Sequence, residues 1–190
     1  MLILGHAGIT LGAATLLAGA VNSRRSPHVS PVSWFHSLSS YIDIRILIVG
    51  SLLPDIIDKP VGQYFFRETF ANGRIFAHTL LFLVLITAAG LFLYKLRRSI
   101  WMLILAAGTF VHLVLDQMWH MPVTLFWPFL GFTFERADIT DWLQNIFQDL
   151  LSVPAIYLPE LVGVAILLWF GMALVFKKQV GAFLKYGKIS

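Results

Sequence analysis

The chain has 190 residues, of which 58% are hydrophobic and 13% are charged, and its mean hydropathy is +0.79. Soluble domains are about 45–50% apolar and about 25% charged. This composition excludes an ordinary soluble protein and predicts an all-α integral membrane protein. The net charge of +4 is expected to set membrane topology rather than to bind nucleic acid. The chain has no cysteine, which excludes disulfides and thiolate metal sites.

Five segments are predicted to cross the bilayer as helices. Three of them have the roughly 20 apolar residues that a crossing needs. A fourth is nearly as long, and the weakest is short and carries Asp43 and Arg45 near its start. No basic residue precedes the first segment, so it is predicted to be a retained helix and not a signal peptide. In chain order, the segments are residues 3–21, 41–54, 75–94, 100–119 and 155–176.

The basic residues predict the orientation of these helices. Ten of the fourteen Lys and Arg residues lie in alternate loops and at the C-terminal end, with Asp43 the single acid among them. The positive-inside rule places these loops in the cytoplasm. We therefore expect a multi-pass protein of the cell membrane, with residues 1–190 as one domain, the N-terminus outside and residues 177–190 as a basic cytoplasmic tail. The ten residues are Arg24, Arg25, Arg45, Lys95, Arg97, Arg98, Lys177, Lys178, Lys185 and Lys188.

The outer loop before the last helix is not a simple connection. Residues 122–134 read PVTLFWPFLGFTF, an aromatic sequence typical of the headgroup region. Residues 140–151 repeat apolar side chains at helical spacing, and Thr140 is a suitable N-cap. We expect an amphipathic helix here, which either lies in the membrane interface or packs on the bundle.

Ionisable residues within or beside the predicted helices gather at the outer face. Given the topology, the outer ends of all five helices carry such residues, whereas the inner face has only His28 and His36 in a loop beside arginines. Ionisable groups in membrane segments mark functional sites by default. The outer residues are His6, Asp55, Asp58, Arg74, His78, His112, Asp116 and Glu160.

The spacing of these residues favours a metal site. Side chains three or four positions apart on a helix lie on one face, as in His112 with Asp116. Imidazole nitrogens and carboxylate oxygens are ligands that zinc, manganese and iron accept. Three histidines and three aspartates exceed the needs of one ion, so roughly one to three divalent ions are predicted, zinc first. The predicted ligands are His6, Asp55, Asp58, His78, His112 and Asp116.

Each residue also has a structural interpretation when it is taken alone. His6 could be a packed histidine, the two aspartates after Pro54 could cap a helix, and Arg74 could be an interfacial anchor. Glu160 could favour a helix start through its charge. His112 and Asp116 could be a structural hydrogen-bonded pair, and His120 could lie in a turn outside the site. The joint occurrence of the residues is what favours a site.

The motifs resemble those of the bacterial and archaeal family of predicted membrane-bound metal-dependent hydrolases. That family is in turn distantly similar to the zinc-dependent phospholipases C of bacteria. One difference is that Asn72 and Gly73 precede Arg74, where the family more usually has a histidine. The motifs are GHAGITLG with His6, LLPDIIDKP with Asp55 and Asp58, GRIFAHTLL with Arg74 and His78, and HLVLDQMWHMPVTLFWPF with His112 and Asp116.

The resemblance implies a hydrolase that acts on a phosphoester of a lipid or a lipid-linked substrate at the outer membrane face. A bound divalent ion lowers the pKa of its water to about 7. Arg74 would clamp a phosphate oxygen, and Glu160 or an aspartate would act as base. The alternatives are a transporter of divalent metal ions or protons, and a structural membrane protein in which a metal only joins helices. The transporter is disfavoured because residues 81–93 are almost wholly apolar.

Overall fold

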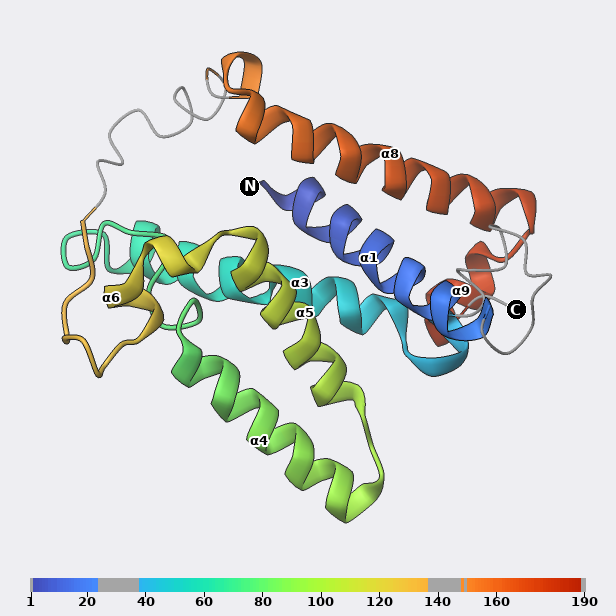
Figure 1. Cartoon of the computed structure of the whole chain (residues 1–190), viewed down its shortest axis with the longest axis horizontal. Coiled ribbons are helices and arrows are strands. Elements are labelled where there is room, and N and C mark those ends of the chain that lie inside the picture. Colours follow the sequence, from blue (N-terminus) through green and yellow to red (C-terminus); the bar gives the residue numbers. More distant parts are fainter. Residues whose placement is uncertain (1, 24–37, 137–147, 149, 189–190) are drawn as a thin grey trace.

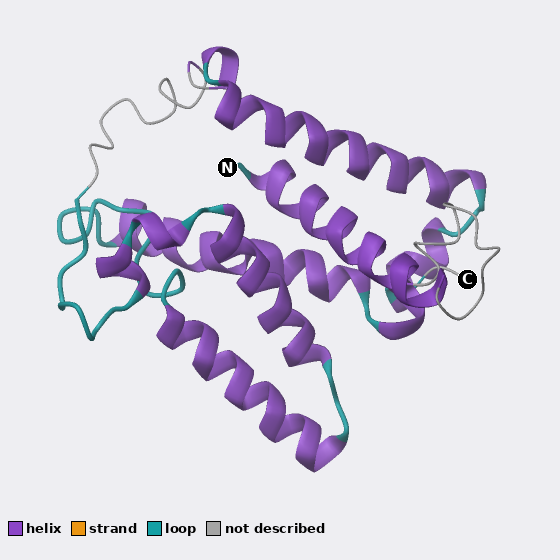
Figure 2. Cartoon of the chain, viewed as in Figure 1, coloured by secondary structure: helices purple, strands orange, loops and turns teal. Residues whose placement is uncertain are grey.

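The computed structural model describes residues 2–23, 38–136, 148 and 150–188. Over these residues the protein contains helices and no strand (Figures 1 and 2). His28 and His36, and the amphipathic helix predicted over residues 140–151 apart from its last residues, lie outside the described part. The all-helical prediction is therefore confirmed for the residues that can be compared.

In the described part of the chain, three helices are long and apolar enough to cross a membrane. They are α1 (Ile3–Ser23), α4 (Leu80–Arg97) and α8 (Pro154–Phe176). Two more apolar helices are shorter, α3 (Ile44–Lys59) and α5 (Trp101–Leu115). The bounds of α1 and α8 agree with the predicted segments to within two residues. Five crossings, and their orientation, remain predictions.

Of the helix boundaries that differ from the sequence-based prediction, two move predicted polar residues into or out of a helix. The second helix was expected to end at Pro54, but α3 continues through this proline to Lys59, so Asp55 and Asp58 lie on the helix and not after it. The third helix was expected from residue 75, but α4 begins at Leu80 with the Thr79 side chain as its N-cap. Residues 73–79 are bends and turns, because their backbone is bound elsewhere.

Small residues let the helices approach each other closely. A Cβ atom on Gly8 of α1 would collide with the backbone of Gly163 on α8. A Cβ atom on Gly108 of α5 would likewise meet the backbone of α3 near Ser51. Close contact of this kind is how helices associate in a membrane, where apolar side chains gain little by leaving lipid. These contacts hold α1 against α8 and α5 against α3. Helix α4 packs on the side of α5 that faces away from α3 (Figure 1).

The apolar core lies away from the polar residues, toward the end of the bundle where Arg45 meets the C-terminal segment. This end is called the basic end below. Leu11, Ile44, Phe170 and Leu174 are buried together there. The short helix α9 (Val180–Tyr186) folds back onto the start of α3, where the Ile44 N–H donates to the Gly187 carbonyl oxygen at 3.1 Å. The predicted basic tail is thus partly helical and docked.

The opposite end of the bundle is built from short elements. These are the π-helix η1 (Pro60–Phe65), the 3-10 turn η2 (Met118–His120) and the one-turn helix α6 (Pro122–Leu125). Aromatic contacts join the segment before α4 to the segment around and after α6. The ring centroids of Phe76 and Trp127 are 5.4 Å apart, and those of Phe70 and Phe134 are 6.0 Å apart. This end also receives the N-termini of α1 and α8 (Figure 1).

Candidate metal centre

The predicted polar residues converge at this end of the bundle. The first turn of α1, the last turns of α3 and α5, and the segment before α4 all contribute side chains to one cluster. His6, His78 and His112 are each 0% exposed. Burying several polar groups in an apolar bundle is unfavourable unless they are mutually satisfied or bind a ligand.

Asp58 organises the segment before α4. Its carboxylate accepts the backbone N–H groups of Ile75 at 2.8 Å, Ala77 at 2.9 Å and His78 at 3.1 Å, which is why this segment wraps around the carboxylate and is not helical. The same carboxylate accepts the Nδ1–H of His78 at 2.7 Å. A carboxylate that holds one ring nitrogen fixes the tautomer and directs the other nitrogen toward a metal.

His112 is held in the same manner by a backbone group. Its Nδ1 lies 2.7 Å from the carbonyl oxygen of Ser51, which can only accept, so Nδ1 carries the proton. The lone pairs of neutral His78 and His112 are therefore both on Nε2, and these two atoms are 3.1 Å apart. Two nitrogens that ligate one zinc ion tetrahedrally at about 2.0–2.1 Å lie about 3.3 Å from each other. The observed separation fits two ligands of one ion.

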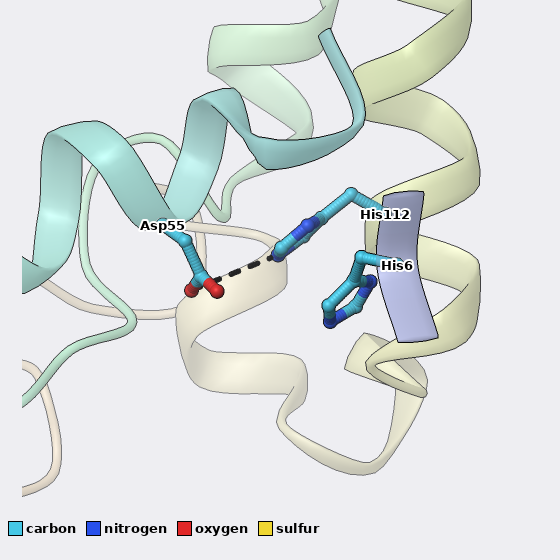
Figure 3. A group of neighbouring side chains, drawn as sticks. All are labelled: His6, Asp55 and His112. Carbon is cyan, nitrogen blue, oxygen red and sulfur yellow. Dashed lines mark ion pairs between the residues drawn. The ribbon is translucent and has the colours of Figure 1, made fainter. Parts of the chain in front are cut away.

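Two carboxylates complete the cluster. Asp55 Oδ1 lies 3.7 Å from His78 Nε2 and 3.9 Å from His112 Nε2. Asp116 Oδ2 lies 3.9 Å from His78 Nε2, and Asp116 Oδ1 accepts from His6 Nε2 at 3.0 Å. The His6 and His112 rings stack, with 4.0 Å between their centroids. Figure 3 shows the Asp55 carboxylate pointing toward the His112 ring, with His6 beside it.

Two overlapping groups of these residues have the geometry to hold a divalent ion. One is His6, Asp55 and His112, and the other is His78, His112 and Asp116; in each, the ligand atoms lie within 4.8 Å of one another. Because Nε2 of His6 donates to Asp116, its lone pair is on Nδ1, which is buried with no hydrogen-bond partner among the described residues. Facing lone pairs and an orphaned buried nitrogen are what a cation would satisfy, so the residues fit a metal with N and O ligands.

Cationic side chains lie on the solvent side of the cluster. Lys59 Nζ donates to Asp55 Oδ2 at 2.6 Å, and Arg74 Nε donates to Asp116 Oδ2 at 2.7 Å. Both side chains remain about one-third exposed, at 32% and 38%. The Asn72 carboxamide oxygen accepts the Arg74 backbone N–H at 2.9 Å and so fixes the turn that presents this arginine.

Other predicted residues lie at the edge of the site or beyond it. Glu160 on α8 accepts the backbone N–H groups of Leu2 at 2.6 Å and Gly5 at 2.9 Å, so it caps α1 directly before His6. Asp58 is engaged by backbone and His78 and belongs to neither ligand group. His120, in η2, is exposed and also lies outside both groups. The structure therefore brings together five of the six predicted ligands.

Sequence reasoning missed the two groups that orient His112 and neutralise Asp55. The Ser51 carbonyl is a backbone atom, which no side-chain pattern reveals. Lys59 could have been found, because it stands four residues after Asp55 and such pairs meet on a helix face. The signal was hidden by the expectation that the helix ends at Pro54.

Comparison with known proteins identifies the family. The family model described as YdjM inner membrane protein matches residues 1–180. The chain belongs to the YdjM inner membrane protein family. No curated protein and no solved structure matches the chain. Family membership agrees with the predicted membrane protein and with an inner-membrane location, and it adds no support for similarity to hydrolases or to phospholipase C.

Proposed function

We propose that the chain is a membrane-bound metal-dependent hydrolase that acts on a phosphoester of a lipid or lipid-linked substrate. The observation that supports this most is the pair of His78 and His112 Nε2 atoms, 3.1 Å apart, facing the buried Asp55 and Asp116 carboxylates. A site that only joined helices would not need partly exposed cations beside its buried carboxylates. Here Arg74 and Lys59 lie at the mouth, which is suited to an anionic substrate.

Each side chain has a part in this proposal. His6, Asp55, His78, His112 and Asp116 hold one or two ions, most suitably zinc, with manganese or iron as alternatives. A divalent ion supplies Lewis acidity and lowers the pKa of a bound water to about 7. Asp58 keeps Nδ1 of His78 protonated and thereby keeps Nε2 available as a ligand.

The substrate anion is handled by the two cations. The Arg74 guanidinium binds Asp116 through Nε and contacts Met121 Sδ through one terminal nitrogen at 3.8 Å, and the side chain remains 38% exposed. A guanidinium matches the geometry of two phosphate oxygens better than an ammonium does. Lys59 adds a second positive charge beside Asp55. Asp55 or Asp116, whichever is less engaged by metal, would accept the proton of the attacking water.

Exposed aromatic side chains near the site support a lipid substrate. Three aromatic side chains on the loops around it are strongly exposed, namely Tyr64 at 81%, Phe129 at 82% and Phe132 at 80%. Among aromatic residues, Tyr and Trp gather at membrane–water interfaces, and the exposed Tyr64 fits this position. A site next to them is at the level where lipid headgroups lie, and we expect this to be the outer face.

A turnover assay tests the proposal. Purified protein in detergent is loaded with zinc or manganese and offered a panel of glycerophospholipids, polyprenyl phosphates and a soluble phosphodiester. We expect metal-dependent release of a phosphate product, reduced by roughly 10²–10³-fold in Asp55→Asn. His120→Ala, which changes an exposed histidine outside the cluster, should retain full activity. No hydrolysis of any member of the panel, together with zinc or manganese uptake into liposomes, would favour the transporter instead.

A further inference from the structure

An apolar groove runs along α1 beyond the candidate metal centre. It encloses about 400 Å³ between α1, the start of α3 and α5, within the 300–1,000 Å³ typical of small-molecule sites. Its floor is buried at Ala18 and Leu38, while Leu17 and Val21 on its rim are exposed at 69% and 48%. The described residues that line it contribute no polar surface. The lining residues are Thr10, Ala13, Ala14, Leu17, Ala18, Val21, Leu38, Tyr41, Ile42, Leu47, Ala107 and Val111.

The groove begins where the metal cluster ends. Thr10, at one end, lies one helical turn beyond His6 on α1, and Val111 directly precedes His112 on α5. The Thr10 hydroxyl oxygen is buried and has no hydrogen-bond partner in the part of the chain that the structure describes. The polar cluster and the apolar groove therefore adjoin, with one unused hydroxyl between them.

The Tyr41 side chain lines the far end of the groove. There the Tyr41 hydroxyl donates to Asn22 Oδ1 at 3.0 Å. From Thr10 to Val21 the wall of α1 extends for about 16 Å at 1.5 Å per residue. The groove is thus apolar along the whole of this stretch of α1.

We propose that this groove holds one hydrocarbon chain of the lipid whose phosphorylated head lies at the metal cluster. A groove that opens beside membrane helices and has no polar lining is filled by hydrocarbon, because lipid tails are the apolar component around it. The inference rests on the proposed function only for the identity of the head; the chain site itself needs no metal and no turnover.

The experiment is photocrosslinking in a bilayer. The full-length protein is placed in nanodiscs that contain a small fraction of phosphatidylglycerol with a diazirine midway along one acyl chain, without added metal. After illumination, labelled residues are mapped by mass spectrometry. We expect labelling of the groove walls on α1 and α5 to exceed labelling of the exposed faces of α4 and α8, and to be competed by unlabelled lipid.

Substitutions that fill the groove make the test specific. Ala107 is exposed on α5 and lines the groove, so Ala107→Phe should remove the excess labelling without disturbing the core. If Ala107→Phe does not fold, Ala13→Phe is used in its place, because it fills the groove from the opposite wall. Ala165→Phe is the matched control, because Ala165 is also exposed on a helix but does not line the groove. The control should label as the wild type does.

Two outcomes would overturn the inference. The first is labelling of the groove no stronger than that of α4 and α8, or unchanged by the filling substitutions, which would mean ordinary boundary lipid. The second is efficient disulfide-linked dimer formation by Ala107→Cys in membranes, since the chain has no other cysteine and such a dimer would place a second copy in the groove. Neither depends on whether the protein hydrolyses a phosphoester, so failure of the groove and failure of the hydrolase can be told apart.

Discussion

The two ends of the bundle use the same chemical groups in opposite ways. At the basic end, Asp43 pairs with Arg45 at 2.7 Å, both side chains are partly exposed, and the carboxylate caps α3 by accepting the Arg45 backbone N–H. The Arg45 guanidinium also donates to the Leu184 carbonyl oxygen at 2.7 Å and so fastens α9. At the site end, the Asp55, Asp58 and Asp116 side chains are buried and lie against histidines. Asp55 and Asp116 also pair with Lys59 and Arg74.

This difference separates a structural ion pair from a candidate site. A partly solvated pair with a cap is satisfied as it stands and asks for no ligand. In the buried cluster, by contrast, two imidazole lone pairs face each other at 3.1 Å and a third ring nitrogen has no hydrogen-bond partner among the described residues. Leaving polar groups unsatisfied in an apolar bundle is costly. The comparison teaches that incomplete satisfaction, and not the presence of charge, marks the place where a ligand belongs.

The largest effect is expected on removal of the buried carboxylate of Asp58. Asp58→Ala leaves three backbone N–H groups and the Nδ1–H of His78 without their acceptor. Breaking a buried charged contact of this kind costs about 3–5 kcal/mol. The free energy of unfolding in micelles should fall by this amount, and the protein should lose metal affinity as well.

The matched change at the other end is Asp43→Ala, which removes a helix N-cap. Loss of such a cap costs about 0.5–2 kcal/mol, and metal content should be unaffected. Equal losses of stability in the two variants would contradict the distinction between the two ends.

A smaller effect is expected on anion binding. Arg74→Ala in the metal-loaded protein should weaken the binding of inorganic phosphate by roughly tenfold to a hundredfold, because a charge-assisted hydrogen bond is worth about 1.5–3 kcal/mol. Isothermal titration calorimetry measures the affinity. Arg45→Ala serves as the control at the basic end, and an equal loss there would show that only the overall charge matters.

Glu160 tests whether a carboxylate at the edge of the site is catalytic. Because both of its oxygens accept N–H groups at the start of α1, Glu160→Gln should lower the unfolding free energy by about 1 kcal/mol, as for other helix caps. Turnover should change by no more than a few-fold. A fall in kcat of roughly 10²–10⁴-fold without loss of stability would instead assign it the role of general base.

The smallest effect is a pH dependence at the basic end. The Arg45 side chain holds the pKa of Asp43 below its usual value of 3.8. A lowered pKa in the folded state stabilises the protein above the usual carboxyl pKa, and this contribution is lost as pH falls through the lowered value. Acid titration of the wild type and Asp43→Asn, followed by circular dichroism, should show this loss only in the wild type. High salt should reduce the difference.

Much of the architecture could be predicted from the sequence, because the apolar segments have a fixed length requirement. The bounds of α1 and α8, and the gathering of polar residues at one end, follow from helix length and alternation of direction. His6, His112 and Glu160 lie at the same end of the bundle, as the sequence predicts. The number of crossings is a separate matter, since α3 and α5 are shorter than the three long helices.

The finer geometry could not be predicted because it depends on tertiary contacts. Pro54 is tolerated inside α3, and nothing local signals this. The start of α4 is delayed to Leu80 because Asp58, 17 residues before Ile75, captures the intervening backbone N–H groups. The same capture changes Asp58 from an expected ligand into a group that orients His78.

The most direct test of the metal centre is elemental mass spectrometry of the purified protein. We would compare the wild type, the His112→Ala/Asp116→Ala double variant and His120→Ala, with circular dichroism to check that each remains folded. The account predicts about one or two equivalents of zinc, manganese or iron in the wild type and in His120→Ala, and none in the folded double variant. A wild-type protein that binds no divalent metal after reloading, or a double variant that binds as much, would contradict it.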